Sequence, residues 1–495
     1  MFAAAMKNMY TTTWNNAKSL ATADKSGEYH GRLALFFHSI RGINRDKLDN
    51  NMEKAAEENL IDAIILAFNA RDCRGGKGER DIGRELFRWI MKNYPFHFRK
   101  VLHFIPEYGR WDDLLFLLME PSSEKEHILE FLSSQLRKDK ALMFEGKPIS
   151  ICAKWCPSEG DSDDRKYKLV DMICNHMKIS PKQYRTEYTT PLRAYLNIVE
   201  KLMCSGKWED IKLSKVPSCA MKKLKKAFEK HIPDIFNEWK AGLSEGKTSV
   251  KAKQLFPYEI IKEIRETGGT QNDILEAQWK VLEEELRKSG VLKRSVVVVD
   301  MSGSMESPNY LPIDNAIALG LIVSSVVTGE FHNHVISFAD IPEFLKLSDT
   351  NIARKYKEIK NLKVGYSTNI QKVFDLILDR GKNAGLTDDD MPEKIFIVSD
   401  MQFNDSSIKG QTNFEEVDIK YNESNFKRPR IVFWNVNGKI TDYPVSVDDN
   451  GTCLISGFSP SILKSILNSS DFSSVGILRT ELDSERYKQV KMALC

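Results

Sequence analysis

The residues best suited to chemistry are a carboxylate and two hydroxyls at alternate positions, Asp300, Ser302 and Ser304. They follow Val296 to Val299, an unbroken β-branched run that predicts a buried parallel strand. Open α/β sheets bind ligands at the C-terminal ends of such strands. Hard oxygen ligands with room for water suit Mg²⁺ or Mn²⁺. The motif therefore predicts a divalent-cation site, although Asp-x-Ser-x-Ser alone also arises at turns and helix caps.

Two later segments are suited to complete this site. Gly365 to Asn369 is a turn before an amphipathic helix, and Lys394 to Asp400 is an apolar run that ends in a carboxylate. The three segments in this order resemble a von Willebrand factor A domain with its metal-ion-dependent adhesion site (MIDAS). The resemblance implies that a partner carboxylate completes the coordination of the cation. The ligands that it implies are Asp300, Ser302, Ser304, Thr368 and Asp400.

A glycine-rich basic loop, Arg71 to Arg80, separates two of the expected helices. It lacks the glycine spacing and the preceding strand of a Walker A loop. It still places backbone N–H groups and cations at the start of a helix, where an anion is stabilised. The alternative is an ordinary turn between helices with a solvated basic face. The candidate anion-binding residues are Arg71, Arg74, Lys77, Arg80, Arg84 and Arg88.

A second basic cluster lies on the helix expected after Val216. Three of its five lysines recur at every fourth position and therefore share one helix face. Such a stripe is usually solvated surface, and it becomes an RNA-binding face only where other basic elements converge on it. The candidate RNA contacts in this cluster are Lys222, Lys223, Lys226 and Lys230.

The pattern of apolar residues changes at Val291. Before it, helical spacing continues with few interruptions, and Gly109 to Asp113 is echoed by Gly206 to Asp210, which suggests HEAT-like helical repeats. After it, apolar strands alternate with helices, as in a doubly wound sheet. We therefore expect a multidomain α and α/β protein. Its parts are a polar lead-in (1–50), an α-helical repeat domain (51–290) and an A-like α/β domain (291–495).

Composition sets broad limits. The 495 residues, 42% of them hydrophobic, fit about two to four globular domains. The net charge is only +3, with a mildly basic helical part and a mildly acidic α/β part. Eight scattered cysteines predict a reducing compartment, and Cys152-x-x-x-Cys156 with Cys174 and His176 is an incomplete zinc pattern. Without a signal peptide or an apolar run of membrane length, a cytoplasmic protein is expected.

The whole chain also resembles a known architecture. A helical front, a basic glycine-rich loop and a C-terminal A domain resemble the TROVE proteins, typified by the Ro autoantigen. A closer resemblance is to a family of unknown function from plants and large DNA viruses. It rests on Ala67 to Arg80, Tyr108 to Asp113, Lys154 to Ser158, Val216 to Met221 and the metal motif. The resemblance implies binding of structured or misfolded small RNA, and a place in virions if the viral branch applies.

Three functions are compatible with these features. The first is a non-enzymatic RNA-binding or ribonucleoprotein scaffold with a Mg²⁺-dependent site for a protein partner. The second is a protein-interaction module without nucleic acid. The third is a Mg²⁺-dependent phosphohydrolase, which is disfavoured because no nucleophile–base pair is recognisable near the metal motif. We expect the first function and no catalysis.

Overall fold

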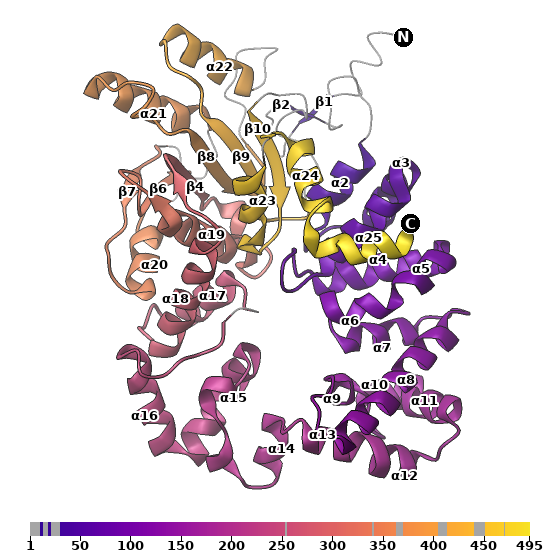
Figure 1. Ribbon diagram of the computed structural model, residues 1–495. Coiled ribbons are helices and arrows are strands. Elements are labelled where there is room, and N and C mark those ends of the chain that lie inside the picture. The colour runs from indigo at the N-terminus through magenta and orange to yellow at the C-terminus, as the bar shows by residue number, and fades with distance from the viewer. Residues whose placement is uncertain are drawn as a thin grey trace.

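The computed structural model describes residues 10–12, 18–20, 30–252, 255–338, 341–362, 370–403, 413–439, 451–469 and 471–495. The chain forms a mostly helical N-terminal region followed by a mixed α/β region. In Figure 1 the helices descend along one side from the α/β region, cross below it and return along the other side. Both ends of the helical region therefore meet the α/β region.

The helical region is built from short and medium helices, preceded by a two-stranded antiparallel pair, β1 (Tyr10–Thr12) and β2 (Lys18–Leu20). A π-helical turn, η2 (Tyr184–Thr189), precedes α13. The helices are α2 (Gly31–His38), α3 (Arg45–Arg71), α4 (Arg80–Asn93), α5 (Pro95–Val101), α6 (Ile105–Tyr108), α7 (Trp111–Met119), α8 (Lys125–Phe144), α9 (Cys152–Trp155), α10 (Ser162–Tyr167), α11 (Leu169–Met177), α12 (Pro181–Gln183), α13 (Thr190–Tyr195), α14 (Val199–Cys204), α15 (Ser218–His231), α16 (Pro233–Ser244), α17 (Pro257–Glu266) and α18 (Asp273–Arg287).

Local sequence explains where several of these helices begin. The side chain of Asn44 accepts a hydrogen bond from the Asp46 N–H over 2.8 Å at the start of α3. Asn272 does the same for the Ile274 N–H at the start of α18, over 3.0 Å. These bonds satisfy N–H groups that have no partner inside the helix.

The α/β region is centred on a six-stranded sheet of order β10-β9-β8-β4-β6-β7, in which only β7 is antiparallel to its neighbour. The chain runs outward from β4 in both directions, so the strand order reverses there, as in doubly wound sheets. The sheet strands are β4 (Ser295–Asp300), β6 (His334–Phe338), β7 (Phe344–Lys346), β8 (Lys394–Ser399), β9 (Arg430–Asn435) and β10 (Thr452–Ser456), and a separate pair is β3 (Leu292–Lys293) and β5 (Val327–Thr328). The helices are α19 (Leu311–Val326), α20 (Ile352–Lys360), α21 (Ile370–Ala384), α22 (Asn413–Glu423), α23 (Leu463–Asn468), α24 (Ser474–Leu482) and α25 (Lys488–Leu494).

Two hydrophobic cores hold the chain together. The larger one is continuous from α2 to α25 and therefore joins the helical and α/β regions. The smaller one belongs to the α14–α16 segment, where Phe228, Phe236 and Trp239 are buried. The helical region is connected to the α/β region at both of its ends, because α2 packs on β10 and α17 packs on α19.

Residues 31–40 depart from the predicted polar lead-in. Leu35 and Phe37 are fully buried, and the helix that carries them packs against α3 and β10. The short apolar run was visible in the sequence, but its burial depends on a strand more than 400 positions away. The expected repeat also differs, because Trp111 begins an α-helix whereas Trp208 lies in a single 3-10 turn.

Candidate functional site

Two carboxylates meet at the C-terminal edge of the sheet. Asp300 ends β4 and Asp400 directly follows β8, the parallel neighbour of β4. The register pairs Val299 with Val398, so both chains leave the sheet at the same level. The two carboxylates are buried, with 0% and 1% of their surface exposed. The reversal of strand order at β4 explains why they meet at this point.

Hydroxyl and amide groups surround the first carboxylate. Asp300 Oδ1 accepts a hydrogen bond from the Ser302 N–H over 2.9 Å, and its Oδ2 accepts one from Ser399 Oγ over 2.5 Å. The Oγ atoms of Ser302 and Ser304 lie 3.1 Å apart. A hydrogen bond with Ser304 favours the charged form of Asp400. Four of the five predicted ligands therefore come together, and Thr368 lies outside the described residues.

Burial dominates the electrostatics of this pair. It raises the pKa of Asp300 to about 7, and the charge of Asp400 adds to that rise. Burial likewise raises the pKa of Asp400. Within the described ranges, no Lys or Arg forms an ion pair with either carboxylate. No cluster of three or more His, Cys, Asp or Glu with metal-binding geometry occurs in the same ranges. The donor set here consists of two acids and two hydroxyls.

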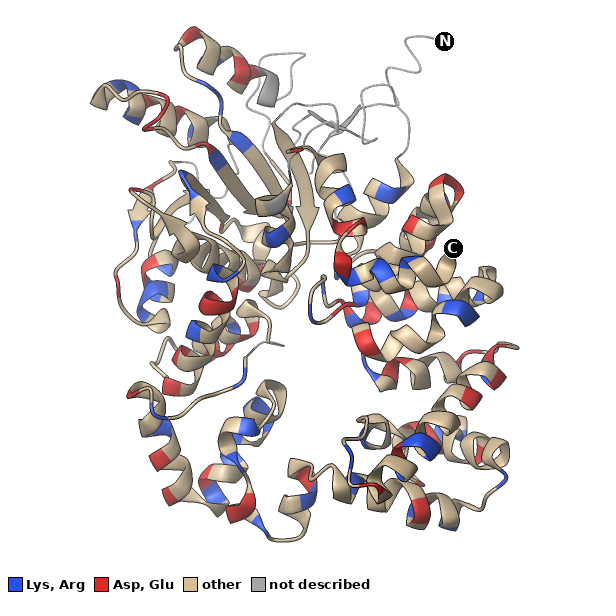
Figure 2. Cartoon of the chain, in the orientation of Figure 1, with Lys and Arg blue, Asp and Glu red and all other residues tan. Residues whose placement is uncertain are grey.

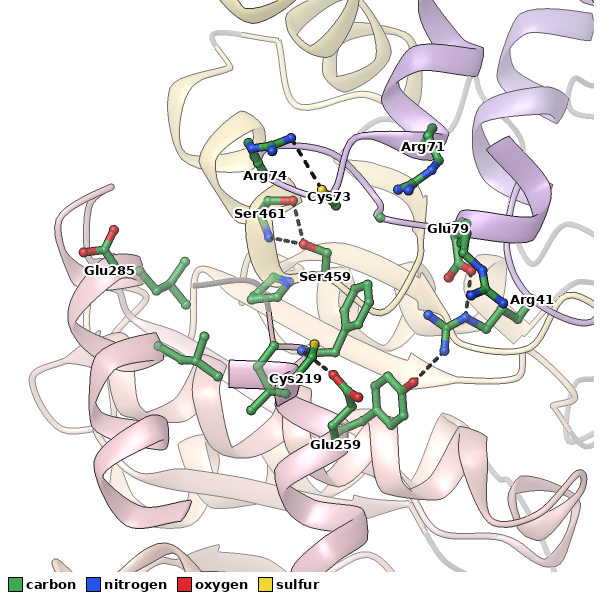
Figure 3. A pocket seen from close by; sticks show the side chains of 18 of the residues that line it. Arg41, Arg71, Cys73, Arg74, Glu79, Cys219, Glu259, Glu285, Ser459 and Ser461 are labelled. Carbon is green, nitrogen blue, oxygen red and sulfur yellow. Dashed lines mark hydrogen bonds and ion pairs between the residues drawn. The ribbon is translucent and has the colours of Figure 1, made fainter. Parts of the chain in front are cut away.

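A cavity of about 510 Å³ lies where three parts of the chain meet. Its walls come from the glycine-rich loop and its neighbours, from the segments around α15, α17 and α18, and from the turn after β10 (Figure 3). Figure 3 shows Ser459 and Ser461 on the same side as Cys73, with Cys219 and Glu259 across the space. Six cationic and four acidic side chains line it, a size and polarity that suit a ligand with negative charge.

Three of the lining cations have no carboxylate partner among the residues that the structure describes. Arg74 is exposed and donates to the backbone carbonyls of Glu107 and Gly109. The guanidinium of Arg110 lies 5.5 Å from the ring centroid of Trp155. Lys464 is exposed on α23. Because no acidic group neutralises these three cations, they can attract an anion into the cavity.

Arg41 makes a second, neutralised part of the wall. Its guanidinium pairs with the buried Glu79 at 2.8 Å and donates to the Tyr258 hydroxyl over 2.6 Å. The same group lies 5.2 Å from the ring of Phe256 and 4.8 Å from that of Phe458. These contacts tie the segment after α2 to α17 and to the turn after β10.

Two residues predicted to bind an anion, Lys77 and Arg71, have buried side chains that already hold partners within the protein. Lys77 is 4% exposed, and its ammonium donates to Ser456 Oγ over 2.8 Å and to the carbonyl of Phe36. Arg71 is 2% exposed and pairs with Asp113 at 2.8 Å. The glycine-rich loop is basic partly because it docks onto the α/β region. A local sequence pattern does not distinguish a cation that docks the loop from one that binds an anion.

The other predicted residues near this loop divide into two kinds. Arg84 pairs with Asp112 and Asp113, and Arg88 pairs with Glu85, so both already have carboxylate partners. Arg74 and Arg80 line the cavity and are exposed, although Arg80 pairs with its neighbour Asp81 at 3.1 Å.

The lysines of α15 are only partly neutralised. Lys222 lies 3.8 Å from Glu259 of α17, whereas Lys223, Lys226 and Lys230 are exposed. Figure 2 shows Lys and Arg interspersed with Asp and Glu along most helices, without a face of one sign. Electrostatic attraction of an anion is therefore local. No local pattern indicates Arg41 or Lys464, because each reaches the cavity from a separate part of the chain.

Two family profiles match consecutive parts of the chain. The profile of a domain of unknown function, DUF2828, matches residues 125–292, and that of another, DUF7788, matches residues 294–493. Uncharacterized protein L728 of Acanthamoeba polyphaga mimivirus is 32% identical over 460 residues, which cover 86% of this chain and 80% of that protein. Among solved structures, the Ro (RSR) protein of Deinococcus radiodurans aligns over 91% of this chain and 99% of its own, with a TM-score of 0.38 and 12% identity.

No helix in the described ranges combines the length and the apolar character needed to cross a membrane.

Proposed function

From the geometry of the cavity we propose that this chain, which belongs to the same family as the mimivirus protein L728, is a non-enzymatic scaffold that binds RNA in the cavity. The observation that carries this proposal is the group of three cations, Arg74, Arg110 and Lys464, on the cavity wall. Phosphates of a nucleic acid supply the missing negative charge. The aromatic rings of Phe256 and Tyr258, which also line the cavity, offer stacking surfaces for unpaired bases.

The proposal includes a divalent-cation site at the sheet edge. Asp300, Ser302, Ser304 and Asp400 would hold Mg²⁺ or Mn²⁺ together with Thr368, whose position lies outside the described residues. Two buried like charges without a cationic neighbour in the described ranges support this assignment, because a divalent cation offsets their repulsion. When bound, the cation supplies an open coordination position for a partner carboxylate. Ser399, through its hydrogen bond, orients Asp300 for this role.

The RNA proposal is tested by titrating the protein with fluorescent single-stranded RNA and following anisotropy at several salt concentrations. Arg74→Gln and Lys464→Gln each remove one cation from the cavity wall. We expect each change to weaken binding and to lower the slope of log K against log salt by about 1. The matched control is Lys138→Gln, which removes an exposed charge from α8 that does not line the cavity. Absence of binding at low salt, or an equal loss in the control, contradicts the proposal.

A second candidate function is a protein-interaction module without nucleic acid, favoured by the paired carboxylates at the sheet edge. In that case Asp300→Asn abolishes recovery of a partner in pull-down experiments, while RNA titrations show no binding to the unmodified protein. A phosphohydrolase remains the least favoured candidate. A phosphatase and nuclease screen with Mg²⁺ distinguishes it, and we expect no turnover.

A further inference from the structure

The cysteines of the Cys152-x-x-x-Cys156 motif take no part in the sites described above. Cys152 begins α9 and Cys156 follows its last residue, so the two are one helical turn apart, joined by a hydrogen bond from the Cys156 N–H to the Cys152 carbonyl over 3.0 Å. Their Sγ atoms lie 3.8 Å apart, and the side chains are buried. Two thiols at this distance are close enough for one sulfur to react with the other once either is oxidised.

A zinc site does not account for the pair. His176, the nitrogen ligand of the incomplete pattern, is held at the surface of α11 by Glu126 and Glu130, at 2.8 and 2.9 Å. Over the residues described, no third Cys, His, Asp or Glu joins Cys152 and Cys156 in a metal-binding group. A structural zinc ion requires four protein ligands. The pair is therefore a dithiol rather than part of a zinc centre.

The backbone around the pair is held by one arginine. Arg193 of α13 donates to the carbonyl of Ala153 over 2.8 Å, to that of Cys156 over 2.6 Å, and to Ser158 Oγ over 3.0 Å. These three bonds fix both the short helix and the turn that follows it. The backbone on both sides of Cys156 is therefore held in place while the two sulfurs lie 3.8 Å apart.

The environment makes the two thiols unequal. A hydrogen bond from the Cys152 thiol lowers the pKa of Cys156, and Tyr184 and the charge of Arg193 act in the same direction against burial. Burial raises the pKa of Cys152 well above its usual range. Cys156 also adjoins an exposed turn, since Glu159 to Asp161 are exposed. Of the two thiols, Cys156 is the slightly more exposed (4% against 0%) and the one whose thiolate is favoured, so we assign it as the sulfur that attacks an oxidant.

We propose that Cys152 and Cys156 are a reversible redox pair that a peroxide converts into a disulfide. The Cys156 thiolate attacks one oxygen of hydrogen peroxide, the O–O bond breaks, and hydroxide leaves and is protonated to water. The Cys152 thiol then attacks the sulfenic sulfur of Cys156, its proton joins the departing hydroxyl, and a second water leaves. Both sulfurs are oxidised and the peroxide is reduced. A small dithiol reverses the reaction by two exchange steps and is itself oxidised.

Tryptic peptide mapping tests this proposal on the full chain, because trypsin cuts after Lys154, between the two cysteines. Cleavage gives peptide 141–154, which contains Cys152, and peptide 155–165, which contains Cys156. The folded, reduced protein is treated with hydrogen peroxide, denatured with an alkylating reagent and digested. We expect a linked species of these two peptides as the main disulfide product, and its loss after treatment with dithiothreitol.

Two variants distinguish specific disulfide formation between Cys152 and Cys156 from non-specific oxidation of cysteines. In Cys152→Ser, Cys156 has no thiol to resolve it, so dimedone is expected to trap a sulfenic acid on peptide 155–165. Cys174→Ser, a change at another buried cysteine, should leave the linked species unchanged. The proposal is overturned if both cysteines remain alkylated thiols while the exposed Cys204 is oxidised, or if the linked species forms only in denatured protein. Circular dichroism before and after peroxide shows whether the protein is folded.

Discussion

The Lys77 ammonium and the Ser456 hydroxyl, 379 positions apart in the chain, are joined by a buried hydrogen bond of 2.8 Å. Lys77 belongs to the glycine-rich loop and Ser456 ends β10. Around them Asn69 donates to Glu481 over 2.8 Å, and Ser461 donates to the carbonyl of Gly76 over 2.7 Å. The loop is thus a docking element between the helical and α/β regions, and its exposed cations are Arg74 and Arg80.

Close packing of this loop predicts that its glycines are not equivalent. A Cβ atom at Gly76 would lie 2.2 Å from the carbonyl oxygen of Asn69, a contact that the backbone must move to relieve. At Gly75 the nearest atom would be a carboxylate oxygen of Asp72 at 3.3 Å. We expect Gly76→Ala to lower the free energy of unfolding by about 2 kcal/mol or more, as overpacking does. Gly75→Ala should lower the free energy of unfolding much less.

Chemical denaturation of the two glycine variants, followed by tryptophan fluorescence, measures this difference. Equal stability of the two would mean that the loop adapts freely and does not dock as described.

Glu481 predicts a pH dependence of stability. Burial raises its pKa from 4.5 to about 7 in the folded protein, while Ser465, Lys77 and Asn69 act against the rise and Asp72 adds to it. Between these two values the folded state binds the proton and the unfolded chain does not, so the contribution of this group falls as pH rises. Between pH 4.5 and 7, we expect the free energy of unfolding of the wild type to fall by up to about 3 kcal/mol relative to that of Glu481→Gln. Denaturation of both proteins at several pH values tests this, and parallel curves would contradict it.

Much of the α/β region could be predicted from sequence because its strands are continuous apolar runs. The run that ends at Asp300 reads as a buried strand, and the one that ends at Asp400 reads as its partner. Parallel strands share one edge, so the meeting of these two carboxylates follows from the strands themselves. The local sequence does not indicate α24, because its first turn consists of Ser474, Val475 and Gly476, which do not favour helix.

The cavity could not be predicted in the same way. Arg74 and Lys77 are three positions apart in one basic loop, yet one is exposed and the other is buried against β10. Local composition is the same for both, and the difference comes from a strand that follows much later in the chain. Arg110 lies within the Tyr108 to Asp113 stretch, but nothing in that stretch indicates that it lines a cavity together with Lys464.

The buried carboxylate of Asp113 predicts a large loss of stability. It is 0% exposed and accepts from both Arg71 (2.8 Å) and Arg84 (2.6 Å), and also from the backbone N–H of Arg110 (2.8 Å). Asp113→Ala leaves the Arg71 charge buried without its partner, which typically costs about 3–5 kcal/mol. The adjacent Asp112 is a matched control, since its side chain is 21% exposed and, among the described residues, its one ion-pair partner is Arg84.

We expect Asp112→Ala to cost about 1 kcal/mol or less, as partly exposed pairs do. Thermal and urea denaturation of both variants checks the contrast. Similar losses in the two would show that the buried network is not what stabilises the junction of α3, α4 and α7.

The paired carboxylates at the sheet edge predict opposite effects of one substitution with and without a divalent cation. In EDTA, Asp400→Asn removes a buried like charge beside Asp300, so the variant should be as stable as wild type or more stable. With Mg²⁺ or Mn²⁺, wild type should gain about 2.7 kcal/mol when the cation concentration is a hundred times its Kd, and Asp400→Asn should gain little. Asp389→Asn, which removes a fully exposed carboxylate from the same region, should respond to the cation as wild type does. Differential scanning calorimetry of the three proteins, each with cation and with EDTA, measures these differences. A wild-type midpoint that the cation does not shift, or a full shift in Asp400→Asn, would rule out a metal site between these strands.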